Sequence, residues 1–300
     1  MSKPYTFTLI IPTYNRADLL VKTLQSILAQ TCNDYEALII DDGSTDATEQ
    51  VVNAFIAQQT CDRFKYFKKE NAERGAARNY GAKHAKGKYL NFVDSDDVLI
   101  NNHLSEALKA INKIDIPEVF HLSYAWVTTE LKKIKEVKSK DQFANNKLIS
   151  GNILSCNGVF IRSDIALENL FNENRNLSAS EDWELWLRLA ARYKIHLIPK
   201  VTSYIVNHDG RSVNQFNETK IIKRRDSLIQ SLSEDEFFIR KYPNGLRKIN
   251  SHMNSYLALH AALHCLKFKS IKYFLISITQ DFSTIFNKRT LVIIKYILFR

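Results

Sequence analysis

Three carboxylates, Asp94, Asp96 and Asp97, crowd one short segment directly after the apolar run 89–93. Like charges this close repel one another, so a folded protein must offset them. A hard divalent cation such as Mg²⁺ or Mn²⁺ does so with oxygen ligands, and it usually binds substrate phosphates as well. A solvated turn that caps the next helix is the alternative, and for a lone Asp-x-Asp-Asp pattern it is the more frequent one.

A second acidic pair, Asp41 and Asp42, follows the apolar run 37–40. If both runs are strands of one parallel sheet, their acidic loops meet at the same edge, where such sheets bind ligands. Two acidic loops at one edge favour a metal or polyol site over coincidence.

Glu181 and Asp182 begin a predicted helix that is rich in tryptophan. As structural residues they would complement the helix dipole. As a catalytic group, a carboxylate there would take a proton from an attacking hydroxyl. The helix N-terminus lowers the pKa of such a carboxylate and burial raises it, so the sequence leaves its strength as a base open.

Basic and histidine side chains near these loops are ambiguous. His208 and Arg211 follow a strand-like run, where Arg211 can hold a phosphate oxygen and His208 can ligate a metal or donate to a phosphate. A lone histidine is more often structural, so the sequence does not favour either role for His208. Arg74 and Arg78, at a predicted helix start, are either phosphate contacts or surface charges.

The elements that must position these residues alternate between strand and helix. Apolar runs at 7–11, 37–40, 64–67 and 89–93 predict buried strands. Helical patterns lie between them, around 18–28, 51–56 and 76–84. This alternation predicts an α/β fold with a doubly wound, mixed, mostly parallel sheet and helices on both faces.

The rest of the chain is less regular. Residues 118–127 predict another strand, 132–147 a charged, exposed segment, and Asn157 a turn that enters a further strand. Ser178 to Glu181 matches a capping box that opens a helix over 182–193. From residue 215 the pattern is helical and basic.

The net charge of +10 lies almost wholly in that last region. Residues 215–300 hold 15 basic and 6 acidic side chains, against 27 and 26 in residues 1–214. A basic nucleic-acid-binding core is therefore not expected. With 45% hydrophobic and 25% charged residues, wholesale disorder is excluded. Four scattered cysteines, no 18-residue apolar run and no signal peptide predict a cytoplasmic protein with free thiols and no membrane span.

The final segment, 287–300, predicts an amphipathic helix. Leu291, Ile294, Ile297 and Leu298 share one face, and Lys288, Arg289, Lys295 and Arg300 lie nearby. Such a helix can lie on an anionic membrane surface, which would make the protein peripheral on the inner face of the cell membrane. The alternative is that this face packs on the catalytic domain or on a second subunit of a homo-oligomer.

Five motifs occur in order along residues 7–212: Pro12-Thr-Tyr-Asn-Arg, Ile40-Asp-Asp-Gly-Ser-Thr-Asp, Ala77-Arg-Asn-Tyr-Gly, Phe92-Val-Asp-Ser-Asp-Asp and Ser180-Glu-Asp-Trp-Glu-Leu-Trp-Leu-Arg-Leu. Together they resemble the family 2 glycosyltransferases of bacterial polysaccharide synthesis, which have the GT-A fold and invert the anomeric centre. The resemblance implies a catalytic, nucleotide-sugar-binding GT-A domain over 1–214, and it does not cover the helical, basic region 215–300.

The resemblance also implies a role for each matching residue. Asp42 would accept a hydrogen bond from the uracil N–H, the Tyr14 ring would lie against the base, and Asp182 would be the catalytic base. Asp96 would bind Mg²⁺ or Mn²⁺, and His208, a looser match, would be a further metal ligand. The positions implied to bind the donor are Pro12, Tyr14, Asp41, Asp42, Arg78 and Asp94. Glu181, Arg74 and Arg211 are further candidates.

The function implied is transfer of a hexosyl or N-acetylhexosaminyl group from a nucleotide sugar, with UDP as the expected nucleotide, to a hydroxyl of a glycan or lipid-linked acceptor. One base without a second, nucleophilic carboxylate fits inversion. Two alternatives stay open. A sugar nucleotidyltransferase would need a Gly-rich phosphate loop, which Pro12-Thr-Tyr-Asn-Arg lacks. A GT-A module that only binds nucleotide or carbohydrate would share the fold without the chemistry.

Overall fold

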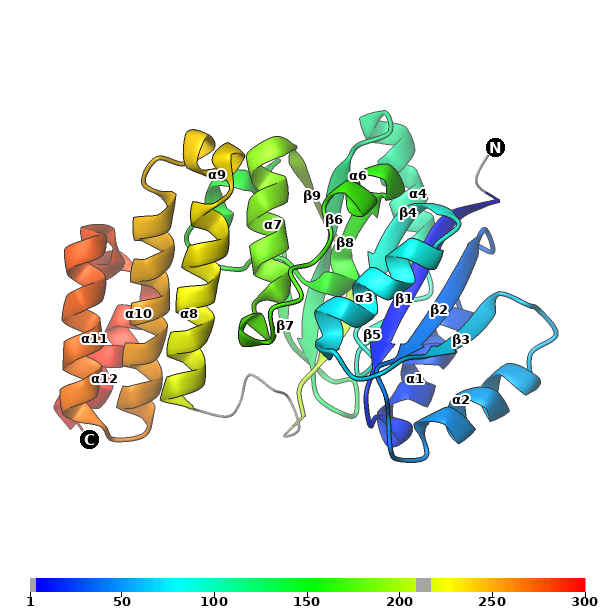
Figure 1. Ribbon diagram of the computed structural model, residues 1–300, viewed down its shortest axis with the longest axis horizontal. Coiled ribbons are helices and arrows are strands. Elements are labelled where there is room, and N and C mark those ends of the chain that lie inside the picture. Colours follow the sequence, from blue (N-terminus) through cyan, green and yellow to red (C-terminus); the bar gives the residue numbers. More distant parts are fainter. Residues whose placement is uncertain (1–3, 209–216, 300) are drawn as a thin grey trace.

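Nine strands form one mixed sheet in the computed structural model, which describes residues 4–208 and 217–299. The order across the sheet is β3-β2-β1-β4-β8-β6-β9-β5, and β7 pairs with β6 (Figure 1). Their bounds are β1 Tyr5–Thr13, β2 Tyr35–Asp41, β3 Phe64–Lys68, β4 Gly87–Phe92, β5 Val98–Leu99, β6 Val119–Val127, β7 Lys133–Val137, β8 Val159–Arg162 and β9 Ile195–Val206.

The longest ladders are parallel, β1 with β2 and β6 with β9, and β8 joins β4 to β6 by antiparallel pairing. This confirms the predicted mixed, mostly parallel sheet. The strand predicted at 7–11 is longer in the structure and includes Pro12, which pairs with Ile40 of β2. On its other side, β1 pairs with β4 only as far as Ile10. The missing N–H of Pro12 therefore interrupts no pairing with β4.

Helices cover both faces of the sheet, as predicted. The helices α1 Ala17–Leu28, α2 Thr48–Ala57 and α4 His103–Ile114 share one core cluster. The helices α3 Glu73–His84, α5 Asn145–Leu148, α6 Ser163–Glu168 and α7 Glu181–Arg192 share the other. Alternate residues of β1 separate the two layers, because Leu9 and Ile11 pack in the first cluster and Ile10 packs in the second.

The helix α3 lies close against the sheet. A β-carbon added at Gly81 would come within 2.5 Å of Ile10 Cγ2 and 3.2 Å of Ile40 Cγ1. Only a residue without a side chain lets the helix approach this far. The contact fixes the start of α3, and with it Arg74 and Arg78, near the ends of β1 and β2.

The start of α7 differs from the prediction. The capping box expected from Ser178 to Glu181 is absent from these described residues, because the helix begins at Glu181 and Ser180 is its N-cap without a side-chain capping bond. Ala179 has a φ of 67°, so the chain turns sharply just before the helix. Glu181 is then the first helical residue, and its carboxylate is free to point into the site.

The region after residue 216 is helical, as predicted. It contains α8 Glu218–Ser233, α9 Glu236–Lys241, α10 Gly245–Leu263, α11 Lys267–Gln280, the short 3₁₀ segment η4 Phe282–Phe286 and α12 Lys288–Phe299. These helices stand beside α7 in Figure 1. Leu228, Leu232 and Phe238 belong to the same apolar cluster as Trp186 and Leu189 of α7, so one core spans both regions. The division at residues 214 and 215 stays a prediction.

The final helix, α12, has one side packed on the protein and another side exposed. Ile293 is fully buried and Ile297 packs partly against the core, whereas Leu291, Ile294 and Leu298 are exposed. Of the four residues predicted to share one face, Ile297 therefore contacts the core, whereas the other three face solvent. Within the described residues, no helix is long and apolar enough to cross a bilayer.

The charged segment 132–147 is largely exposed, as predicted. Its β7 is an exposed edge strand with Lys133 and Lys135, and Ala144 is the one residue of the segment that is buried.

Candidate active site

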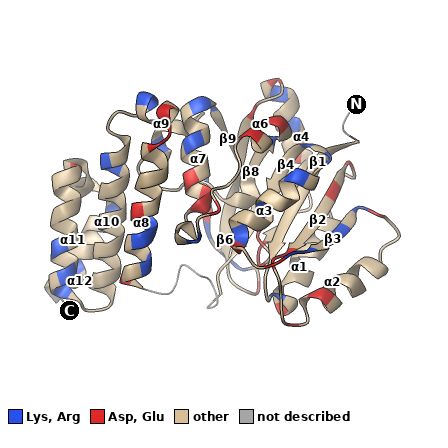
Figure 2. Cartoon of the chain, in the orientation of Figure 1, with Lys and Arg blue, Asp and Glu red and all other residues tan. Residues whose placement is uncertain are grey.

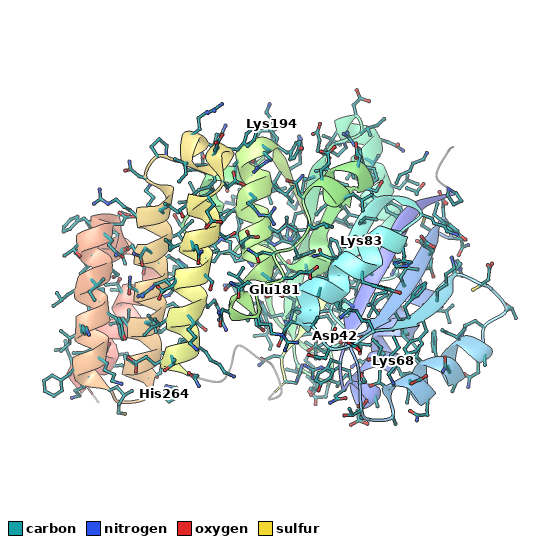
Figure 3. All side chains as sticks on the ribbon, viewed as in Figure 1. Asp42, Lys68, Lys83, Glu181, Lys194 and His264 are labelled. Carbon is teal, nitrogen blue, oxygen red and sulfur yellow. The ribbon has the colours of Figure 1, made fainter. Side chains whose placement is uncertain are left out.

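A cavity of about 480 Å³ lies where β1, β2 and β4 end and α7 begins. Figure 3 labels Asp42 and Glu181 close together in the lower middle of the view, whereas Lys194 lies beyond the opposite end of α7. The lining residues are Pro12, Thr13, Tyr14, Arg16, Asp42, Asn71, Glu73, Arg74, Arg78, Asp94, Ser95, Asp96, Cys156, Ala179, Glu181 and Asp182. The structure therefore brings together nine of the predicted site residues.

One wall carries Pro12, Tyr14 and Asp42. The ring of Tyr14 is half exposed, so it offers a face to a planar group. Asp42 is buried, and its Oδ1 accepts from Lys69 Nζ at 2.7 Å and from the backbone N–H of Ala72 at 3.0 Å. Among the described residues none donates to Asp42 Oδ2, which leaves that oxygen available to a ligand.

The donor-binding role expected for Asp41 is not supported by its position. Asp41 is fully buried and is not a lining residue. Its carboxylate accepts from Tyr66 Oη at 2.5 Å and from the backbone N–H of Ser44 at 2.7 Å. The charge therefore holds the loop after β2 in shape, and Asp42 alone of the pair faces the cavity.

Arg78 joins the acidic turn after β4 to the start of α7. It is 1% exposed, and it donates from Nη1 to Glu181 Oε1 and from Nη2 to Asp94 Oδ1, each at 2.8 Å. Arg74 lies nearby, with Nε 3.6 Å from the same Glu181 oxygen. Burial alone would raise the pKa of Glu181, but the charges of Arg74 and Arg78 lower it, so this carboxylate stays ionised.

Asp182 is a lining carboxylate with a raised pKa. Burial, together with the negative charge of Glu181, raises the pKa of Asp182 to about 6. Its Oδ2 accepts from Asn152 Nδ2 at 2.9 Å, and its Oδ1 accepts from the backbone N–H of Trp183 at 2.7 Å. The sequence left open whether the helix dipole or burial would dominate the pKa of Asp182, and burial dominates. The raised pKa gives Asp182 the basicity that a general base needs near neutral pH.

Asp96 faces two basic groups. Its Oδ2 lies 3.0 Å from His208 Nε2 and 3.6 Å from Arg16 Nη2. Asp97 positions this turn through two hydrogen bonds. Its Oδ1 accepts from the backbone N–H of Val206, and its Oδ2 accepts from Asn157 Nδ2. The end of β9 is thereby fastened to the acidic turn, and His208 is brought to Asp96.

The donor set of Asp96 and His208 suits a divalent cation. No group of three or more His, Cys, Asp or Glu side chains in the described part of the chain converges to hold a metal. Mg²⁺ and Mn²⁺ typically take one or two protein ligands and fill the remaining positions with substrate phosphates and water. The carboxylate oxygen of Asp96, which lines the cavity, and the imidazole nitrogen of His208 beside it fit that pattern.

Several residues of the site were not predicted from the sequence. Arg16 lies in the motif that begins at Pro12, and Lys69 follows β3 just as Asp42 follows β2, so a search of every strand end would have found both. Asn152 and Asn157 lie in an irregular stretch without periodicity. The sequence marks Asn157 only as a turn before a strand, and nothing in it assigns either residue to the site. Arg211 lies outside the described residues.

A family profile described as Glycosyl transferase family 2 matches residues 8–165, more than half of the chain. The chain belongs to this family. This match confirms the motif resemblance. It ends before α7, so the placement of Asp182 in the cavity comes from the structure and not from the profile.

Relatives share the family region. A glycosyltransferase of Rickettsia felis is 34% identical over 202 residues, covering 66% of this chain and 32% of the relative. The teichoic acid biosynthesis protein GgaB of Bacillus subtilis is 29% identical over 234 residues, covering 70% of this chain and 24% of that protein. A beta-1,3-glucosyltransferase of Campylobacter jejuni is 37% identical over 108 residues, covering 35% of this chain and 34% of that enzyme. The matched region is about a third or less of each relative's length.

Solved structures share the fold. TarS of S. aureus, residues 1–349 in complex with UDP-GlcNAc, superposes with a TM-score of 0.64 at 19% identity, covering 93% of this chain and 91% of that one. The mannosyltransferase PcManGT of Pyrobaculum calidifontis, in complex with GDP-Man and Mn²⁺, gives 0.58 at 16% identity, covering 92% and 87%. The predicted GT-A-like fold is confirmed. A coverage of 93% extends into the helical region, which the sequence motifs did not reach.

Proposed function

We propose that the protein is an inverting glycosyltransferase that moves a sugar from a UDP-sugar to a hydroxyl of a glycan or lipid-linked acceptor. The observation that carries this proposal is Asp182, a carboxylate with a pKa of about 6 in the same cavity as Asp42 and Asp96. A base on one side and nucleotide- and phosphate-binding groups on the other are what a single displacement needs.

On the donor side, Asp42 Oδ2 accepts from the uracil N–H and the Tyr14 ring lies against the base. On the other side, Asp182 takes the proton of the acceptor hydroxyl, whose oxygen forms the new bond to the anomeric carbon. The bond from that carbon to the diphosphate oxygen breaks, and UDP leaves with its electron pair. No second carboxylate is needed as a nucleophile, so the anomeric centre is inverted.

Asp96 and His208 would hold a Mg²⁺ or Mn²⁺ ion with the donor. When bound, the cation offsets the charge that develops on the departing diphosphate. Arg74 lines the same cavity and can add a further positive charge near that group. Asp94 is held by Arg78 and is placed to accept from a ribose or sugar hydroxyl.

The relatives support this substrate class. The TarS structure contains UDP-GlcNAc, GgaB is named for teichoic acid biosynthesis, and the Campylobacter enzyme is named for an acceptor linked to PP-undecaprenol. A cell-surface polymer or its lipid-linked precursor is therefore the acceptor class that we propose.

We also propose that the C-terminal helices contact an anionic membrane. Figure 2 shows Lys and Arg recurring along α11 and α12. Large apolar side chains are exposed among them, including Phe268, Leu275, Phe286, Leu291 and Leu298. This mixture of cations and apolar groups suits a lipid surface, which would place the enzyme beside a lipid-linked acceptor.

The test is a donor panel. The full chain is incubated with Mn²⁺ or Mg²⁺ and several UDP- and GDP-sugars, and the release of nucleoside diphosphate is measured. We expect release with at least one UDP-sugar, loss in excess EDTA, and a fall of more than a hundredfold in D96N, which corresponds to about 3 kcal/mol. UDP binding without release from any donor would instead identify a binding module.

A further inference from the structure

Asn152, in the irregular segment before β8, contacts the carboxylate of Asp182. Its Nδ2 donates to Asp182 Oδ2 at 2.9 Å. Its Oδ1 accepts from the backbone N–H of Leu154 at 3.2 Å. This second bond decides which way the amide is turned, because the oxygen is already used and the NH₂ group is left to face Asp182. The contact is therefore a directed hydrogen bond from an amide donor to a carboxylate oxygen.

The segment that carries Asn152 lies against α10. Gly151 has a φ of 142°, and a β-carbon added to it would come within 2.6 Å of His252 Cε1. Only glycine allows both this backbone conformation and this close approach. His252 also packs edge-on against Trp183, with ring centres 5.2 Å apart. One side chain of α10 thus contacts the residue before Asn152 and the residue after Asp182, which fixes the two partners relative to each other.

An N–H donor stabilises the ionised form of a carboxylate. The backbone N–H of Trp183 is the second such donor, at 2.7 Å from Asp182 Oδ1. The thiol of Cys156 is a weaker partner, with Sγ 4.0 Å from Oδ2, and burial raises its pKa so that it stays uncharged. Of these three partners, Asn152 is the side chain that does not line the cavity. Its hydrogen bond can therefore be removed without changing the surface that a donor sugar meets.

We propose that Asn152 is a positioning residue for the proton transfer at Asp182, because its amide fixes the direction of the carboxylate and favours the ionised form. This deepens the proposed function, on which the assignment of Asp182 as the base rests. The hydrogen bond itself, and its effect on the titration of Asp182, do not depend on that assignment.

Several other groups set the titration of Asp182, and all of them stay in place when Asn152 is replaced. Burial and the charge of Glu181 raise the pKa of Asp182, whereas Arg78 lowers it. His252 is neutral, because burial lowers its pKa to about 3. The charged and titratable groups that act on Asp182 or respond to its charge are Glu181, Asp94, Arg78, Cys156, Tyr124 and Arg224.

The experiment is a pH titration of the full chain, labelled with ¹³C at the aspartate carboxyl groups and followed by NMR without any donor. The signal of Asp182 is the one that disappears in D182N. N152A removes the amide donor, so the pKa of Asp182 should rise by about half a unit to one unit. UDP affinity, measured by calorimetry, should stay unchanged.

N152D separates a hydrogen-bonding role from a purely structural one. It is nearly isosteric with the wild type and can keep the bond from Leu154, but it replaces the donor with a second negative charge. One of the two neighbouring carboxyls should then ionise at a higher pH than Asp182 does in N152A. N146A is the matched control, because Asn146 is an exposed asparagine of α5 outside the cavity lining, and it should leave the titration unchanged.

The activity should follow the same order. The acid limb of kcat/KM for UDP release should lie at the lowest pH in the wild type, higher in N152A and highest in N152D. If N152A disturbs the segment and loses UDP binding, N152D decides alone.

An unchanged pKa of Asp182 in N152A would overturn the proposal. So would an upper pKa in N152D that is no higher than in N152A, or a shift in N146A as large as in N152A. Failure of the donor panel is a separate result, because the NMR titration needs no turnover. A chain that releases UDP but shows none of these shifts refutes the positioning role alone.

Discussion

The carboxyl group of Asp182 is uncharged at low pH and ionised at neutral pH, because burial and the charge of Glu181 raise its pKa to about 6. Only the ionised form can accept a proton. We therefore expect kcat/KM to fall as the pH drops below about 6 and to level off roughly one unit above it. The profile of UDP release against pH measures this limb. A limb centred near 4 would show that another group is the base.

Replacing Asp182 separates chemistry from binding. D182N keeps the shape and removes the base, so kcat should fall by roughly 10²–10⁴ while UDP affinity stays unchanged. Calorimetry with UDP and initial rates with the active donor give the two numbers. If UDP binding is lost in parallel, Asp182 is a structural or nucleotide-binding residue, and Glu181 would be the next candidate for the base.

Arg78 is a buried charge between two carboxylates, and removing it takes a hydrogen-bonded charged partner from each. R78Q leaves Glu181 buried without the guanidinium that it contacts at 2.8 Å. Breaking a buried pair in this way costs about 3–5 kcal/mol. Urea unfolding should show a loss of that size, and R16Q, at the more exposed edge of the same cavity, should lose far less. Similar losses in both would show that Arg78 does not hold the acidic turn after β4 to α7.

Neighbouring residues show what the sequence could predict at this scale. Asp41 and Asp42 are the same residue type at adjacent positions, yet Asp41 is buried under the sheet edge and Asp42 lines the cavity. Because successive strand side chains point to opposite faces, one of the two was bound to face away. Which one depends on Tyr66 of the next strand, whose hydroxyl donates to Asp41. That contact exists only after the strands have paired.

Among the elements, α3 depends on a single glycine. G81A would place a methyl group 2.5 Å from Ile10 Cγ2, so the helix must move or the core must deform. We expect a loss of about 1–3 kcal/mol in the free energy of unfolding. K83A, at an exposed position of the same helix, is the control and should change it little. Equal stability of the two variants would mean that α3 is not held close to the sheet.

The first hundred residues were predictable because their strands are apolar runs and their helices are amphipathic. The stretch 149–158 was not, since it has neither period, yet it supplies Asn152 and Asn157 to the site. The start of α7 was misread because Ser178 to Glu181 fits a local capping rule. The sharp turn at Ala179 and the hydrogen bond from Arg78 to Glu181 are tertiary effects that override this local rule.

The whole molecule has an exposed apolar and basic end in α11 and α12. Full-length protein should float with vesicles that contain anionic lipid at low salt, and less so at high salt. Because Ile293 is fully buried, truncation would open the core, so point substitutions are the better test. The triple variant F268S/L291S/L298S should lose flotation. I134S, which removes an exposed apolar side chain from β7, should not.

Loss of flotation in I134S as well, or no flotation of the wild type, would contradict the membrane proposal. Self-association of the wild type that the triple variant abolishes would assign the same surface to a second copy of the chain.

The helix α7 is buried almost all round, between the sheet and the C-terminal helices. The hydrogen-bonded backbone amides beyond its first turn should therefore exchange with deuterated solvent at the slowest rates in the chain, when the entire protein unfolds. Asp182 thus stands at the first turn of a segment whose body resists local opening. Any induced fit during turnover must come from the substrates and the loops at the strand ends, while the proton acceptor keeps one fixed position.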